Sequence, residues 1–314
     1  MKPYLCFLAA TGLLAAPALT AHARIERTVE KTFTVQPGGR LHVETQGGEI
    51  RVTPGTDSVV KITAREKIRA DSDTEADDLL KKLELSLEQT GNDVSATSRY
   101  EQRLPGFHWG SWPPVQVDFI ITVPASFATD LHTSGGGITI GDLNGKVNAR
   151  TSGGGIHLGK IGADVDARTS GGSVTLDEAK GEVKLGTSGG NITVGKVAGP
   201  ADLSTSGGSI KVDSVVGALH AATSGGNIRA GISGPLKDDC VLSTSGGSVR
   251  ISIDKKAAFR LDASTSGGSV NAEGLTITLE KSNSSRSRLA GDVNGGGPLL
   301  KLRSSGGSID LKSL

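Results

Sequence analysis

The sequence predicts an all-β protein, a single-stranded parallel β-helix or β-solenoid with coils of about 18 residues and an irregular, strand-rich N-terminal part that contains one short helix. The first observation is a Thr-Ser-Gly-Gly motif that returns every 18 residues from Thr133 to Thr223. The second is an alternation of apolar and polar residues after each motif. The third is a low aromatic content of 3%, which leaves little bulk for a wide globular core. A fixed period of this size is typical of stacked repeats that share one core.

The repeated motif predicts a structural corner in each coil. Its threonines are Thr133, Thr151, Thr169, Thr187, Thr205, Thr223, Thr244 and Thr265. The last two follow steps of 21 residues, and a variant begins at Ser304. We expect the glycine pair to adopt positive φ angles in a tight turn. We expect each threonine to point inward and bond the turning backbone or the next threonine. The alternative is a displayed threonine row, as on ice- or glycan-binding solenoids.

Each repeat contains two short strands. In the first unit Ile138 and Ile140 flank Thr139, and further on Val147 and Ala149 alternate with polar residues. Apolar residues at a spacing of two indicate strands with one buried face. Glycine pairs inside a helix would cost about 1 kcal/mol per glycine, so a helical repeat does not fit. Each unit therefore reads as strand, corner, strand, corner.

The repeat sequences point to a known family. The units TSGGGI, TSGGSV, TSGGNI and TSGGSI resemble the DUF4097 family, whose members are called bacterial "putative adhesins". The C-terminal stretch Ser287–Leu314, with three consecutive glycines and RSSGGSIDL, resembles the usual ending of that family. The resemblance covers nearly the whole chain. It implies a right-handed parallel β-helix-like fold and an exported, non-enzymatic protein, with no catalytic residues to carry over.

Residues 1–23 have the features of a secretory signal peptide. Lys2 supplies the positive charge, and an apolar run extends from Leu5 to Leu19. That run is short of the about 20 apolar residues that a membrane anchor needs. Ala21-His22-Ala23 fits the small-x-small cleavage rule, so we expect cleavage after Ala23. The protein should then be periplasmic or secreted, with no integral membrane segment after cleavage.

Residues 24–132 predict irregular coils or a cap, continuous with the regular solenoid of residues 133–314. Thr45 to Val52 resembles a degenerate first repeat, and residues 74–82 predict a short helix with Asp73 or Thr74 as its N-cap. A hairpin is expected from Leu83 to Tyr100. The open ends of a solenoid expose unpaired backbone and need covering. We expect the stretch from Leu275 to Leu302 to close the C-terminal end.

The strongest candidate for a ligand site is the loop that follows this hairpin. Its candidate ligand-binding residues are Tyr100, Phe107, His108, Trp109 and Trp112. Aromatic faces with a polar rim suit a sugar or a peptide. The alternative is that the rings pack down and cover the end of the solenoid. The outward columns of the repeats carry mixed polar residues and indicate a solvated face.

Charge and motifs exclude several classes of function. Lys and Arg number 34 and Asp and Glu number 33, a balance that argues against nucleic acid as a partner. The histidines lack metal-ligand spacing, and neither a nucleophile elbow nor a phosphate loop is present. Cys240 follows Asp238-Asp239, a poor setting for a nucleophile, and the other cysteine lies in the signal peptide. We therefore expect no enzyme activity, no cofactor and no metal.

These observations favour a non-catalytic exported β-solenoid, an adhesin-like binding or scaffold protein of the bacterial cell envelope. Its partner would be an envelope glycan or protein of unknown identity. Two alternatives stay open. One is a β-helix enzyme that acts on a polysaccharide, by analogy of fold alone. The other is a filament subunit that stacks end to end.

Overall fold

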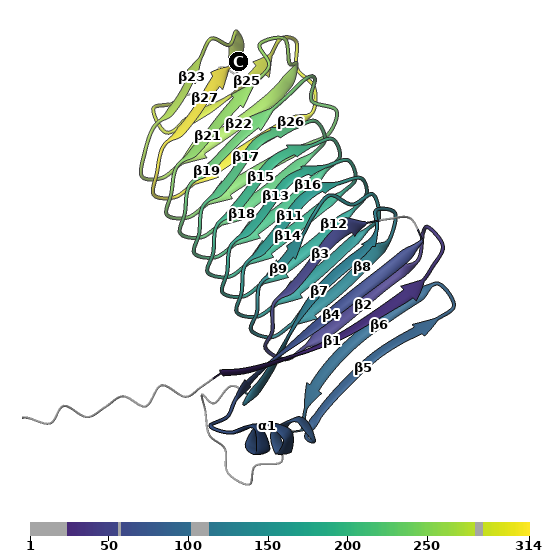
Figure 1. The fold of residues 1–314 in the computed structure, drawn as a ribbon. Helices are drawn as coiled ribbons and strands as arrows, with labels where there is room; N and C mark the ends of the chain where they lie inside the picture. Colours follow the sequence, from purple (N-terminus) through teal and green to yellow (C-terminus); the bar gives the residue numbers. More distant parts are fainter. Residues whose placement is uncertain (1–23, 56–57, 102–112, 280–284) are drawn as a thin grey trace, which may run out of the picture.

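A computed structural model describes residues 24–55, 58–101, 113–279 and 285–314 as a long stack of coils with two facing sheets (Figure 1). Sheet A contains, in spatial order, β1 (Arg24–Thr34), β4 (Val59–Arg69), β7 (Val115–Pro124), β3 (Ile50–Gly55), β9 (Ile138–Ile140), β11 (Ile156–Ile161), β13 (Val174–Ala179), β15 (Ile192–Val197), β17 (Ile210–Val215), β19 (Ile228–Ile232), β21 (Val249–Ile253), β27 (Ile309–Ser313) and β23 (Val270–Glu273). Sheet B contains β24 (Ile277–Leu279), β25 (Arg288–Val293), β22 (Phe259–Thr265), β26 (Leu299–Ser304), β20 (Cys240–Thr244), β18 (Leu219–Thr223), β16 (Ala201–Thr205), β14 (Val183–Thr187), β12 (Val165–Thr169), β10 (Val147–Thr151), β8 (Ala128–Thr133), β2 (Arg40–Thr45), β6 (Asp93–Tyr100) and β5 (Leu83–Thr90). Each regular coil gives one strand to each sheet, which confirms the predicted β-solenoid.

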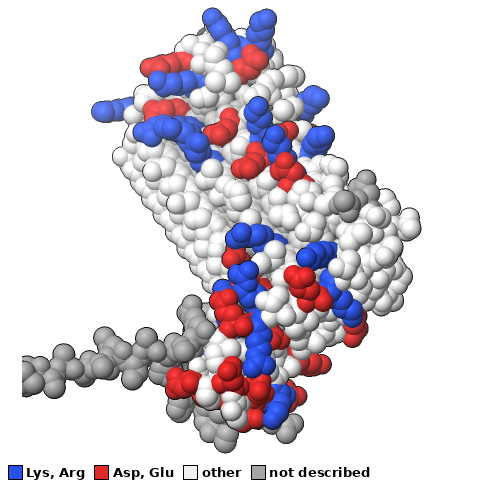
Figure 2. Space-filling model, viewed as in Figure 1, with Lys and Arg blue, Asp and Glu red and all other residues white. Residues whose placement is uncertain are grey.

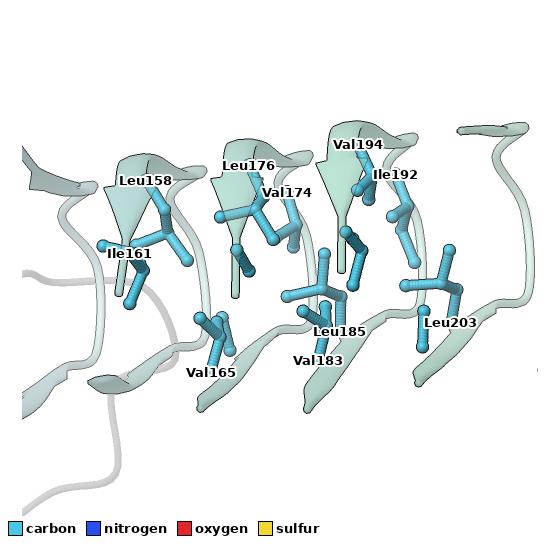
Figure 3. Close-up of a cluster of buried hydrophobic side chains, with 14 of the residues drawn as sticks. Leu158, Ile161, Val165, Val174, Leu176, Val183, Leu185, Ile192, Val194 and Leu203 are labelled. Carbon is cyan, nitrogen blue, oxygen red and sulfur yellow. The ribbon is translucent and has the colours of Figure 1, made fainter. Parts of the chain in front are cut away.

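The core is a narrow column of aliphatic side chains between the two sheets. Ile156 pairs in register with Ile138 on one side and with Val174 on the other, and this parallel pairing continues from coil to coil. Figure 3 shows Leu158, Leu176 and Val194 side by side in one row, each from a neighbouring coil. All six of these residues are at most 2% exposed and belong to one continuous hydrophobic cluster. Because identical positions stack, every coil buries the apolar face of its neighbour.

The N-terminal region joins the same stack but leaves the simple order of coils. The coil formed by β2 and β3 lies between β8–β9 on one side and β6–β7 on the other, with Thr45 in register with Thr133. β1 and β4 add antiparallel strands to sheet A, and the predicted hairpin is β5–β6. The predicted helix is α1 (Asp73–Leu80), and its N-cap is Ser72, one residue before the positions we expected, because the Ser72 hydroxyl accepts the Glu75 N–H.

The C-terminal end corrects the expected order of coils. β26 and β27 carry the last motif, and they lie between the coil of β20–β21 and the coil of β22–β23. Ser304 therefore pairs with both Thr244 and Thr265, which are consecutive in the sequence but separated by one layer in the stack. The antiparallel strands β24 and β25 cover the outer edge of β22. So the stretch we expected to close the stack does so only in part, since Leu299–Ser304 is an interior strand.

Candidate functional site

The threonines of the motif form an internal column at one corner of the stack. Thr205 is 6% exposed, and its hydroxyl donates to the carbonyl oxygen of Gly190 in the preceding coil at 2.9 Å. The same hydroxyl accepts the N–H of Gly208 in its own coil at 3.3 Å. This pair of contacts recurs through the regular coils, and Ser304 makes it at its own level. The column therefore ties each coil to the next and is not displayed to a ligand.

The glycines of the motif serve close backbone approach, and the expectation of positive φ angles was wrong. The described glycines with positive φ all lie outside the motifs of the regular coils. A Cβ placed on Gly190, the second glycine of its motif, would lie only 2.0 Å from the carbonyl oxygen of Gly172. The equivalent glycines of neighbouring coils show the same approach, for example 1.9 Å at Gly208 and 2.2 Å at Gly154. Glycine is required because successive corners touch backbone to backbone.

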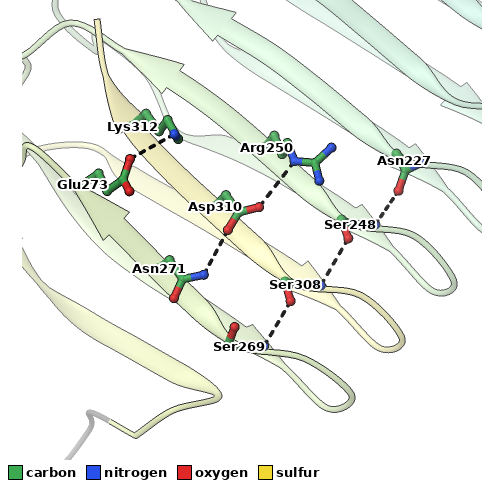
Figure 4. Close-up of polar contacts among 9 residues, drawn as sticks. All are labelled: Asn227, Ser248, Arg250, Ser269, Asn271, Glu273, Ser308, Asp310 and Lys312. Atoms are coloured by element: carbon green, nitrogen blue, oxygen red, sulfur yellow. Dashed lines mark hydrogen bonds and ion pairs between the residues drawn. The ribbon is translucent and has the colours of Figure 1, made fainter.

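A second ladder, which our sequence analysis did not identify, runs beside these glycines. The residue after the glycine pair offers a side-chain oxygen to the backbone N–H of the same position in the next coil. Asn227 accepts from Ser248 at 2.8 Å, Ser248 from Ser308 at 3.2 Å, and Ser308 from Ser269 at 3.3 Å (Figure 4). The signal was visible in the sequence as Ser or Asn at this position. The ladder also follows the spatial order of the C-terminal coils.

Of the predicted aromatic site, only Tyr100 lies in the part of the chain that the structure describes. It is 7% exposed and packs with Ile68, Ala76 and Val115 in a small second core beside α1. Burial raises the pKa of its phenol. Phe107, His108, Trp109 and Trp112 fall outside the described residues. Binding by this loop therefore stays a prediction that rests on those four.

The outward face of sheet A changes character along the stack. In the middle coils its central row consists of Thr139, His157, Thr175 and Thr193, and further on it continues with cations. In the view of Figure 2, blue and red side chains gather toward both ends of the stack, while the coils between them are largely white. Charge is therefore segregated along this face, although the whole chain is nearly neutral.

The cations in this row form a ladder of three. Lys211, Arg229 and Arg250 occupy neighbouring parallel strands in direct register. All three side chains are exposed. Lys211 pairs with Asp213 at 2.9 Å, and Arg250 pairs with Asp310 at 3.4 Å. Among the described acidic residues, none forms an ion pair with Arg229, which stands between the other two cations.

A trough of about 540 Å³ opens beside this ladder on β19, β21, β27 and β23. Its polar lining consists of Arg229, Arg250, Ser252, Asn271, Glu273, Asp310 and Lys312. Asp310 also accepts a hydrogen bond from the Asn271 amide at 3.0 Å, and Lys312 pairs with Glu273 at 2.9 Å (Figure 4). The trough thus combines three cations, two carboxylates, an amide and a hydroxyl. Such a set can bind a ligand that carries both an anionic group and neutral polar groups.

A smaller polar cluster lies on the outer face of sheet B, toward the N-terminal end. Asp130 accepts hydrogen bonds from His42 at 3.0 Å, from His132 at 2.9 Å and from the Asn148 amide at 2.7 Å. Burial opposes ionisation of Asp130, but the bonds from the two histidines outweigh it and hold its pKa below the ordinary value. A hollow of about 250 Å³ adjoins His42 and Asp130. The cluster fixes two imidazole rings 6.0 Å apart at the surface.

The described part of the chain offers few side chains that could act in catalysis or bind a metal ion. Within residues 24–55, 58–101, 113–279 and 285–314, no group of three or more His, Cys, Asp or Glu side chains could hold a metal ion. Cys240 is buried, and burial raises the pKa of its thiol, with Asp238 and Asp239 adding to the effect. A buried, protonated thiol is a poor nucleophile. The same described ranges contain no helix long and apolar enough to cross a membrane.

Comparison with known proteins places this geometry in a family. The sequence model described as Toastrack DUF4097 matches residues 39–312. No curated protein matches the chain significantly. One similar solved structure is a "putative adhesin" from Parabacteroides distasonis, with 12% identity, a TM-score of 0.36 and coverage of 92% of this chain and 97% of that chain.

Two further structures show the same degree of likeness. A "putative adhesin" from Bacteroides fragilis has 11% identity and a TM-score of 0.34, with coverage of 92% of this chain and 97% of that chain. A "putative cell adhesion protein" from Clostridium sporogenes has 13% identity and a TM-score of 0.23, with coverage of 92% and 100%. Superpositions this loose transfer no property to the present protein. The match over residues 39–312 does confirm the resemblance carried by the TSGG units, and the chain belongs to the Toastrack DUF4097 family.

Proposed function

We propose that this protein is an exported, non-catalytic binding scaffold of the bacterial cell envelope. The observation that carries the proposal is the trough on the outer face of sheet A, where four neighbouring strands present cations, carboxylates, an amide and a hydroxyl around one hollow. The signal-peptide features of residues 1–23 support export.

The stack is suited to binding because it holds its surface groups in fixed positions. Neighbouring strands in such a sheet lie about 4.8 Å apart, and their register fixes which side chains stand next to each other. The trough residues Arg250 and Asn271 are further oriented by Asp310. A ligand that meets preoriented groups loses less affinity to the ordering of side chains. The scaffold therefore holds at fixed spacings side chains that would otherwise be mobile.

The N-terminal edges of the two sheets support end-to-end assembly of subunits less than the trough supports binding of a ligand. Lys31 of edge strand β1 donates to the carbonyl oxygen of Leu87 in edge strand β5 at 2.6 Å. Gln89 of β5 donates to the carbonyl oxygen of Thr34 at 2.8 Å. A lysine on an edge strand opposes pairing with another sheet edge. We therefore prefer binding of a ligand over stacking of subunits.

The proposal is tested with the mature chain that begins at Arg24, applied to a glycan array and to envelope extracts from its own cells. We expect saturable capture of at least one envelope glycan or protein. Failure to bind any component of either would overturn the binding role. Cell fractionation with a C-terminal tag tests export separately, and recovery of the protein in the cytoplasm alone would contradict it.

The two candidate surfaces are separated by matched variants of the mature chain. Loss of capture on the double change Trp109→Ala and Trp112→Ala, with Arg250→Gln silent, would assign binding to the predicted aromatic loop. The reverse result would assign it to the trough. Arg250 is exposed, so its replacement leaves the buried core intact, and thermal unfolding of the tryptophan variant shows whether that chain is still folded.

A further inference from the structure

We propose that the trough binds an acidic glycan, a sugar chain whose carboxylate or sulfate groups are separated by neutral hydroxyl groups. This inference rests on the proposed binding function and names its ligand class. The anionic group would contact Arg229 of the cation ladder, and the neutral part of the chain would lie over Ser252 and Asn271.

The ladder places three cations side by side on the sheet. Arg229 stands in register between Lys211 and Arg250, and like charges in directly opposite positions destabilise a sheet. The other two cations have acidic partners, at 2.9 Å and 3.4 Å, whereas no described acidic side chain pairs with Arg229. An anion at Arg229 would relieve this repulsion and could accept two parallel hydrogen bonds from the guanidinium group.

Two carboxylates also line the trough. Glu273 and Asp310 stand beside the cations, so a densely charged polyanion such as a nucleic acid would meet repulsion along part of its length. An acidic peptide with consecutive carboxylates would meet the same two residues. A sugar chain carries its charges singly, and its hydroxyl groups can bond an amide, a hydroxyl or a carboxylate. The mixed lining therefore favours the glycan.

The experiment uses isothermal titration calorimetry on the full mature chain at low and high salt. The probes are a short oligogalacturonate, its methyl ester as a neutral counterpart, and a sparsely sulfated dextran against dextran, so that carboxylate and sulfate recognition are distinguished. The test variant is Arg229→Gln. The matched control is Lys196→Gln, which removes one exposed cation from the same sheet, two coils away on β15; no residue in the described part of the chain forms an ion pair with it.

We expect one or both acidic probes to bind, with an affinity that falls as salt rises. Arg229→Gln should weaken this binding by about tenfold or more, equivalent to about 1.4 kcal/mol, because a hydrogen bond to a charged group is lost. Lys196→Gln should change it by less than about twofold, since it lies outside the trough. Lys196→Gln should unfold at the temperature of the parent chain, because its side chain is exposed. Arg229→Gln should unfold at that temperature or slightly above it, because it removes the central cation of the ladder.

Three results would overturn the inference. They are equal binding of an acidic probe and its neutral counterpart, equal loss in both variants, and no binding of either acidic probe. In each case capture of another glycan or of a protein in the envelope experiments would leave the general binding function intact. A chain that binds nothing in those experiments would remove the proposed function as well.

Discussion

Replacement of Gly190 by alanine should destabilise the stack, whereas the same change at Gly186 in the same coil should not. The added Cβ at Gly190 would lie 2.0 Å from the carbonyl oxygen of Gly172 and 2.4 Å from its carbonyl carbon. Both are backbone atoms, so no side-chain rotation can relieve the contact. At Gly186 the nearest atoms belong to side chains, Arg168 Cγ at 3.6 Å and Ser204 Oγ at 3.7 Å. These are ordinary van der Waals contacts.

The expected loss in the free energy of unfolding follows from the hydrogen bonds that must break. To move from 2.0 Å to the 3.4 Å at which ordinary contact begins, the corner must separate from the coil below. Several hydrogen bonds cross that gap, and three of them are donated by Thr187, Gly189 and Asn191 at 2.7, 3.0 and 3.1 Å. At about 1 kcal/mol each, their loss lowers the free energy of unfolding by about 3 kcal/mol. Gly186→Ala should be neutral or stabilise by up to about 1 kcal/mol, since alanine restricts the unfolded chain.

The assay is urea unfolding of the mature chain followed by circular dichroism, with parent, Gly190→Ala and Gly186→Ala measured side by side. Equal stabilities of the two variants, within about 0.5 kcal/mol, would refute the close-approach explanation. That result would mean that the corner can move apart without cost. A destabilised Gly186→Ala variant would equally contradict the reasoning.

Two further predictions concern buried polar groups. Thr205→Val should lower the free energy of unfolding by about 2 kcal/mol in the same urea assay, because Gly190 and Gly208 each lose a hydrogen bond to the hydroxyl. Thr205→Ser should largely retain the stability of the parent chain, because the hydroxyl of Ser304 makes the equivalent bond at its own level. Glu66→Gln should stabilise the protein at neutral pH, because burial, only partly offset by a nearby arginine, raises the pKa of Glu66 above 4.5 and makes its ionisation unfavourable in the folded state. The gain should vanish as pH falls below 4.5, where the carboxyl is protonated in both states, and a gain that does not change with pH would contradict this cause.

Most of the fold was predictable because the repeat period itself indicates which residues of neighbouring coils pair. Residues one period apart, such as Ile156 and Val174, must pair when coils stack, and they do. The order of the last coils was not predictable. Ser304 continues the motif equally well after Thr265 or between Thr244 and Thr265, since all corners are alike. Only the packing of β24 and β25 against β22 shows that these two strands already occupy the outer edge of β22, where the last coil would otherwise stack.

The candidate site was predictable only in part, for the same reason. Lys211 and Arg229 lie one period apart, and Arg250 follows after the longer step, so the cation ladder could be read from the aligned repeats. Asp310 could not be placed beside Arg250, because that neighbourhood exists only through the inserted last coil. The trough therefore depends on a change of coil order that local sequence patterns do not encode.

Hydrogen exchange of the mature chain, with and without a saturating glycan ligand, tests most directly whether the outer face of the stack performs the function. We predict that the ligand slows exchange in the peptides that contain β19, β21 and β27, and leaves residues 100–115 unchanged. Protection confined to residues 100–115, or absent from all three strands while the ligand is bound, would contradict the account.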